Sequence, residues 1–171
     1  FAGKLSAVQK DQLTATPRTD DGFSNAYAIL YADAKSRGAA SEQRYLLESL
    51  MSVPENQRNP ALLVERAQLA VHRKAYDAAL TDANLAERHW ARLPPKLIFS
   101  RKAMIYETQA ASWQGKFYES GGEDLMSGHR AVQAWKRFQQ HAETRNRKDM
   151  IAIADSRIES ITNALERLEN P

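Results

Sequence analysis

Apolar residues recur at three- and four-residue spacing along most of this chain, and short clusters of glycine or proline interrupt the pattern. The first clear stripe runs through Phe23, Tyr27, Leu30 and Tyr31, and it ends before Gly38. Such spacing places apolar side chains on one face of an α-helix, whereas a half-buried strand would alternate polar and apolar residues. We find no convincing segment with that alternation. The pattern therefore predicts an all-α fold.

Turn and capping residues divide the pattern into seven expected helices. The main boundaries are Gly38, Pro54, the pair Asn59-Pro60, the run Leu93-Pro94-Pro95 and the pair Gly121-Gly122. Glycine commonly follows the end of a helix, while proline starts or interrupts one. We expect the fourth helix to carry Tyr76 through Trp90 and the last to cover about residues 146–168. Residues 1–19 lack a sustained period and are expected to form a flexible leader, followed by a single α-helical domain over residues 20–171.

Composition limits the function classes that are open to the chain. A length of 171 residues suits one domain, and the absence of cysteine excludes a disulfide scaffold, a thiolate zinc site and a cysteine nucleophile. The 24 basic and 21 acidic residues leave a net charge of +3, which is too small to predict strong polyanion binding. No apolar run approaches the roughly 18–20 residues of a membrane-spanning helix.

The start of the sequence suggests where the protein acts. The chain begins Phe1-Ala2-Gly3 without an initiator methionine. Together with the expected leader and the lack of cysteine, this favours a processed periplasmic or envelope-anchored protein over a cytoplasmic one. A bacterial envelope or lipoprotein assembly is the setting that we expect.

Small residues recur at regular distances between residues 60 and 95. Ala67 lies in the first helix expected there, and Tyr76, Ala79, Ala83 and Ala86 lie in the second. Small side chains at these positions let two antiparallel helices approach closely, and the tyrosine fills the space beside their turn. The segment resembles a tetratricopeptide repeat, a helix–turn–helix unit of about 34 residues.

Two more divergent copies flank the central repeat, so the resemblance covers about residues 21–142. They carry Ala28, Tyr31, Ala40 and Leu47 in the first copy, and Ala103, Tyr106, Ala131, Trp135 and Phe138 in the third. The resemblance implies about three antiparallel helix pairs stacked as a short solenoid, with the last helix capping the stack. The central copy departs from the family pattern at Arg66, Lys74 and Pro94. An irregular helical bundle with coincidental alanine spacing is the alternative.

The resemblance also implies a function, because members of the family bind protein or peptide segments in a concave groove. The first helix of each pair lines that groove. The corresponding positions in this sequence are Asn25, Ile29, Asp33, Val64, Gln68, Val71, His72, Ser100, Met104 and Glu107. We therefore expect a non-enzymatic adaptor that binds a protein or peptide partner. The Lys/Asn clamp that some members use to hold a terminal carboxylate is not recognisable, which argues against that kind of ligand.

A basic stretch over residues 130–148 supports an alternative function. This basic ridge comprises Arg130, Lys136, Arg137, Arg145, Arg147 and Lys148. With the interleaved Trp135 and Phe138 it would suit a helical domain that binds nucleic acid. Both aromatic residues also lie on the apolar stripe of their helix, and core packing explains them better.

The last expected helix offers a third possibility. Its apolar residues step by three or four positions, as in a coiled coil, through Met150, Ala154, Ile158, Ile161, Leu165 and Leu168. We expect this seam to cap the domain. The alternative is an oligomerisation or regulatory protein that forms a homodimer through residues 146–168.

Patterns typical of catalysis are lacking. The four histidines form no metal-binding motif, and no phosphate-binding loop or nucleophile elbow is present, so we expect no catalytic, metal or cofactor site. The carboxylates of Asp33, Glu48 and Glu107 fall within expected helices, where a solvated face is the simpler explanation. Phe117 and Tyr118 lie in a loop-like insertion over residues 114–124, where they either anchor the loop or bind a partner.

Overall fold

The computed structural model describes residues 5–18, 20 and 22–170, and this part of the chain folds into helices without a strand. The α-helices are α1 (Ala7–Thr14), α2 (Phe23–Ser36), α3 (Ala40–Met51), α4 (Pro60–His72), α5 (Tyr76–Arg88), α6 (Pro95–Glu119), α7 (Leu125–Glu143) and α8 (Lys148–Glu169). Two short 3₁₀-helices, η1 (Pro54–Asn56) and η2 (Trp90–Arg92), lie between them. The all-α prediction is confirmed.

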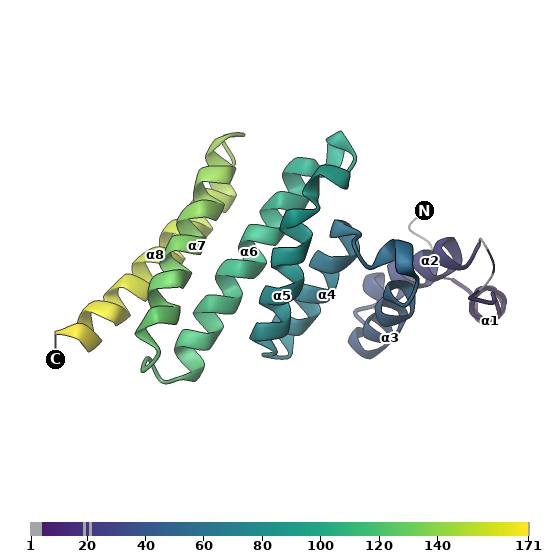
Figure 1. The fold of residues 1–171 in the computed structure, drawn as a ribbon, viewed down its shortest axis with the longest axis horizontal. Coiled ribbons are helices and arrows are strands. Elements are labelled where there is room, and N and C mark those ends of the chain that lie inside the picture. Colours follow the sequence, from purple (N-terminus) through teal and green to yellow (C-terminus); the bar gives the residue numbers. More distant parts are fainter. Residues whose placement is uncertain (1–4, 19, 21, 171) are drawn as a thin grey trace.

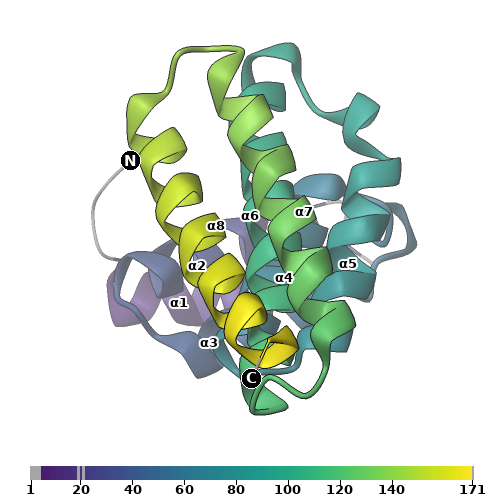
Figure 2. The same cartoon turned by 90° about the vertical axis from the view of Figure 1, so that its left-hand side faces the viewer.

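The helices follow one another in a row, with α1 and α8 at opposite ends (Figure 1). Nearly every helix packs against its neighbours in the sequence, and α4 also contacts α6. Figure 2, seen from the α8 end, shows α7 and α8 lying side by side across α6. The row therefore exposes long helix faces on which a partner could dock.

Local sequence signals explain most of the helix boundaries. Asn59 caps α4 by accepting a hydrogen bond from the backbone N–H of Ala61, and Pro60 occupies the first turn. Gly38 follows α2 with a φ of 68°, a left-handed conformation that glycine adopts at little cost. Trp90, which the sequence assigned to the fourth helix, instead begins η2, because α5 ends at Arg88.

Three groups of buried side chains hold the row together. Phe23, Leu30, Leu47 and Leu50 pack between α2 and α3. The middle group joins α3 to α6 and contains Met51, Leu63, Val64, Ala86 and Ile105. The third group joins α6, α7 and α8 and contains Phe117, Trp135, Phe138, Ile161 and Leu165. Trp135 and Phe138 are therefore core residues.

The segment expected to be a flexible leader contains α1, whereas residues 1–4 and 19 lie outside the described residues. Ser6 and Gln9 form a reciprocal capping box at the start of this helix. Asp33 on α2 ties the segment down by accepting a hydrogen bond from the Leu5 backbone N–H at 3.0 Å and pairing with Lys10 at 2.8 Å. None of the α1 residues is buried, so the helix leaves no apolar period in the sequence.

The predicted loop insertion over residues 114–124 is mostly helical, because α6 continues to Glu119. Phe117 is only 1 % exposed and packs in the third core group, whereas the side chain of Tyr118 is exposed. Gly115 suggested a break, yet it lies within α6. A Cβ atom there would come within 2.3 Å of the Tyr76 ring, so glycine allows α5 to begin close to α6. The loop prediction was wrong because Gly115 makes room for the Tyr76 ring beside α6 and does not form a turn.

The seam of α8 packs inside the chain. Ala154, Ile161 and Leu165 are buried against α6 and α7, and Met150 and Ile158 are partly buried beside them. Leu168 is the exception, with an exposed side chain. Apart from Leu168, the apolar face of α8 thus packs against helices of the same chain.

Candidate functional site

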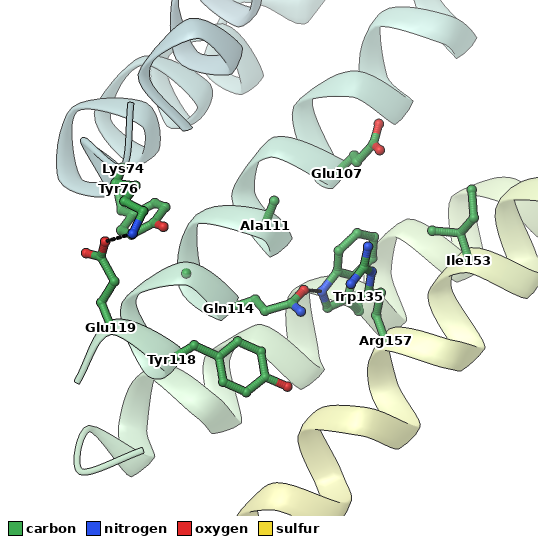
Figure 3. Close-up of a pocket in the computed structure, with 11 residues that line it drawn as sticks. Lys74, Tyr76, Glu107, Ala111, Gln114, Tyr118, Glu119, Trp135, Ile153 and Arg157 are labelled. Atoms are coloured by element: carbon green, nitrogen blue, oxygen red, sulfur yellow. Dashed lines mark hydrogen bonds and ion pairs between the residues drawn. The ribbon is translucent and has the colours of Figure 1, made fainter. Parts of the chain in front are cut away.

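A trough of about 840 Å³ lies over one face of α6, and we call it the α6 trough (Figure 3). Its lining residues are Lys74, Tyr76, Glu107, Ala111, Gln114, Gly115, Tyr118, Glu119, Trp135, Ile153 and Arg157. Glu107, Ala111, Gln114 and Tyr118 are spaced by four, three and four residues, so they share one side of the helix. This side of α6 forms the floor.

Other helices form the two walls of the trough. Lys74 and Tyr76 stand on one side, at the turn between α4 and α5, while Ile153 and Arg157 of α8 stand on the other (Figure 3). Lys74 has a φ of 62° and its ammonium lies 3.3 Å from the Glu119 carboxylate. The two walls therefore come from residues about 80 positions apart in the sequence.

Trp135 of α7 closes the floor between α6 and α8. Its ring is only 3 % exposed, and its Nε1–H donates a hydrogen bond to Oε1 of Gln114 at 3.0 Å. This bond satisfies the indole nitrogen and orients the Gln114 amide at the floor. The floor beneath a bound segment would thus be held in place by the core.

The trough combines apolar and charged groups. Ile153 and Tyr118 have exposed side chains, and the Tyr118 hydroxyl lies 3.2 Å from the hydroxyl of Ser160 on α8. Desolvation raises the pKa of Glu107 above its usual value, and this carboxylate has no ion-pair partner among the described residues. A chain segment with apolar side chains and a hydrogen-bond donor for Glu107 would complement this lining.

The predicted groove residues do not come together in one place. Glu107 lies in the α6 trough, while Gln68 and His72 line a second hollow of about 500 Å³ between α2, α3 and α4. The exposed residues Asn25, Ile29 and Ser100 line neither hollow, and Val71 and Met104 are half-buried.

Two of the predicted groove residues are buried, so those two assignments were wrong. Val64 is fully buried beside Ile105, because this side of α4 packs against α6. The buried carboxylate of Asp33 accepts a hydrogen bond from the Leu5 backbone N–H and pairs with Lys10 and Arg37.

Sequence reasoning missed a buried carboxylate at the second hollow. Glu65 of α4 accepts hydrogen bonds from the Tyr31 hydroxyl at 3.1 Å, the Lys35 ammonium at 2.5 Å and the Arg101 guanidinium at 2.7 Å. Burial alone would raise the pKa of Glu65, but the bonds from Lys35 and Arg101 keep it below its usual value. The cluster ties α2, α4 and α6 together. Tyr31, Lys35 and Arg101 are 30 to 36 residues from Glu65 in the sequence, so no local motif predicts the cluster.

The basic ridge is largely engaged within the chain. The guanidinium groups of Arg130, Arg137 and Arg145 lie over the rings of Trp113, Tyr106 and Phe99, at 4.7, 4.5 and 5.6 Å from the ring centres. Arg137 also pairs with Glu87, and Arg147 with Asp149. Lys136 and Lys148 are exposed. Arg130 and Arg137 therefore link α7 to α5 and α6, and Arg145 contacts α6 from the loop after α7.

No protein-family model, curated protein or solved structure matches this chain. Among the described residues, no helix is both long enough and apolar enough to cross a membrane. The same residues contain no group of three or more His, Asp or Glu side chains placed to hold a metal ion. The function is accordingly inferred from the geometry of the chain itself.

Proposed function

We propose that this chain is an interaction module that binds a segment of another protein in the α6 trough. The observation that carries the proposal is the floor of α6, which stays open between the wall at Lys74 and Tyr76 and the wall at Ile153 and Arg157. In a tetratricopeptide-like interpretation, α2–α3, α4–α5 and α6–α7 are three helix pairs and α8 is the cap. This interpretation leaves the first helix of the third pair free to contact a ligand.

The lining favours a protein segment as the occupant. Exposed Tyr118 and Ile153 offer apolar contact area, and aromatic residues of this kind often supply much of the affinity of a protein interface. Glu107 and Arg157 add charges of opposite sign, which would set the direction and register of a bound segment. An adaptor function follows, because the chain would hold a partner without altering it.

Site-specific photo-crosslinking tests the proposal. A photoreactive benzoyl-phenylalanine placed at Ala111 on the trough floor should capture a partner from a lysate of the source cells. The matched control places the same residue at Ala152, an exposed alanine of α8 that does not line the trough. A protein captured from position 111 and not from position 152 is then identified by mass spectrometry.

A second variant makes the test independent of the crosslinker. Ala111→Arg should weaken binding of the captured protein at least about tenfold, because the long side chain fills the floor, whereas Ala152→Arg should change it less than about twofold. Equal capture from both positions, or binding that Ala111→Arg leaves unchanged in a folded variant, would show that the trough is not the binding site.

A further inference from the structure

A second surface, separate from the α6 trough, lies across α3 and α4. The hollow of about 500 Å³ adjoins another of about 270 Å³, and Arg44, Leu69 and Arg73 line both. We call the combined depression the α3–α4 groove. Leu69 is half-buried and contributes apolar surface where the two hollows meet, and the two arginines are exposed.

The charges that line this groove are not balanced locally. Lys35, Arg44, Arg66 and Arg73 line it, against the carboxylates Glu48, Glu65 and Asp82. Arg101 reaches Glu65 from outside the groove, so that carboxylate is already shared by two cations. Asp82 likewise accepts two hydrogen bonds of 2.6 Å from the Arg66 guanidinium.

The excess positive charge falls on the two arginines that both hollows share. Arg73 makes one 3.4 Å bond to the carbonyl of Leu69 and has no carboxylate partner among the described residues. Arg44 lies 3.4 Å from Glu48, and about half of each side chain is exposed. An exposed pair of this kind contributes little, so a ligand carboxylate could replace Glu48 at small cost.

We propose that the α3–α4 groove binds an acidic segment of a partner protein. An apolar side chain of the segment packs on Leu69, and carboxylates on either side of it pair with Arg44 and Arg73. Arginine suits this task because its planar guanidinium can hold a carboxylate through two hydrogen bonds. The excess of positive charge distinguishes this groove from the α6 trough, where Lys74 and Arg157 are matched by Glu107 and Glu119.

A peptide titration with matched charge variants tests the inference. The probe is a fluorescein-labelled peptide with one leucine between two pairs of glutamates, titrated with the full chain at about 0.1 M salt to limit long-range attraction. The double variant Arg44→Gln/Arg73→Gln should weaken binding about tenfold through loss of both ion pairs. The control Arg58→Gln/Arg88→Gln removes the same charge from exposed positions outside the groove and should change binding less than about twofold.

A variant with reversed charges distinguishes loss of the binding site from unfolding of the chain. Arg44→Glu/Arg73→Glu should lose the acidic peptide and gain the same peptide with lysine in place of glutamate, a gain that a misfolded chain would not show. Failure of the wild-type chain to bind the acidic peptide, or equal weakening by both glutamine double variants, overturns the proposal. So does displacement of the peptide by inorganic phosphate at equal concentration, which would indicate a simple anion site. Ala111→Arg should leave this titration unchanged, so the two proposals fail separately.

Discussion

Both ends of the helix row have an apolar core, and the amino-terminal end adds buried carboxylates that join its helices through ion pairs. At the amino-terminal end, carboxylates on α2 and α4 join the helices, since Asp33 binds α1 to α2 and Glu65 binds α2 to α4 and α6. At the carboxy-terminal end, Phe117, Phe138 and Ile161 are almost fully buried between α6, α7 and α8. Apolar burial stabilises without regard to pH, whereas ion clusters fix geometry and depend on protonation. The α6 trough therefore lies at the end whose core is the apolar group of α6, α7 and α8.

Truncation of the packed end should have the largest effect on stability. Phe117→Ala removes a ring that is 1 % exposed and leaves a cavity beside Trp135 and Ile161. The expected loss is about 3–5 kcal/mol in the free energy of unfolding, measured by urea denaturation. Tyr118→Ala, at the exposed neighbouring position, is the control and should cost less than about 1 kcal/mol. A loss from Phe117→Ala no larger than this would show that the core of α6, α7 and α8 contributes little to stability.

Disruption of the Glu65 cluster should have the next largest effect. Glu65→Leu leaves the buried Tyr31 hydroxyl, the half-exposed Lys35 and the partly buried Arg101 without their acceptor. Breaking a buried ion pair costs about 3–5 kcal/mol, and the half-exposed Lys35 reduces the expected loss to about 2–3 kcal/mol. The same urea experiment measures it, and a neutral or stabilised Glu65→Leu variant would show that the cluster is replaceable by apolar packing.

The pH dependence of stability sharpens this prediction. The folded state lowers the pKa of Glu65, so the unfolded chain binds the proton more readily. The stabilisation by ionised Glu65 is therefore complete above its usual pKa of 4.5 and is lost as the pH falls through the lowered folded value. The stability difference between wild type and Glu65→Gln should shrink from about pH 6 to about pH 3. A difference that stays constant over this range would exclude the ionic contribution.

A smaller loss of stability is expected from a substitution at Gly128, where α7 approaches Leu165 of α8. A Cβ atom at Gly128 would come within 2.7 Å of Leu165 and 2.9 Å of Phe117. Gly128→Ala should therefore cost about 1–2 kcal/mol, because the clash exceeds the usual gain in helix propensity. If crowding is the cause, a Leu165→Ala substitution should cost less in the Gly128→Ala background than in the wild-type chain. Strictly additive losses would contradict that cause.

The smallest effect should come from Arg137, the arginine of α7 that contacts α5 and α6. Arg137 lies over the ring of Tyr106 and pairs with Glu87, and its side chain is half exposed. Arg137→Gln should cost about 0.5–1 kcal/mol, and Lys136→Gln beside it should have no measurable effect. Thermal unfolding of both variants would detect the difference. Equal values would mean that the contacts of Arg137 contribute nothing to the fold.

Sequence reasoning could predict the features of the fold that depend on local signals. Helix positions followed from local signals such as Asn59-Pro60 and Gly38, since caps and periodicity act over a few residues. Helix α1 was missed because none of its residues is buried, so it shows no apolar stripe in the sequence. The loop expected around Gly115 was wrong because this glycine packs against Tyr76, a contact between residues distant in the sequence.

The candidate sites were less predictable than the fold. Glu107, which the repeat register placed in a groove, lines the α6 trough. Trp135 and Arg157 reach the trough from other helices, and only the packing of α7 and α8 brings them there. Glu65 was missed because an ion cluster among three helices leaves no pattern in one of them. A local signal predicts an element, whereas a site made by several elements requires their arrangement.

The order of the helices in the row has a consequence for how quickly the chain folds. Helices that meet are mostly consecutive, and side-chain hydrogen bonds among the described residues span at most 50 positions, between Glu87 and Arg137. Short loops close at low entropic cost, and proteins with such local contacts fold in microseconds to milliseconds. Each helix pair can therefore form soon after its residues leave the ribosome, before the trough and its far wall on α8 have been synthesised.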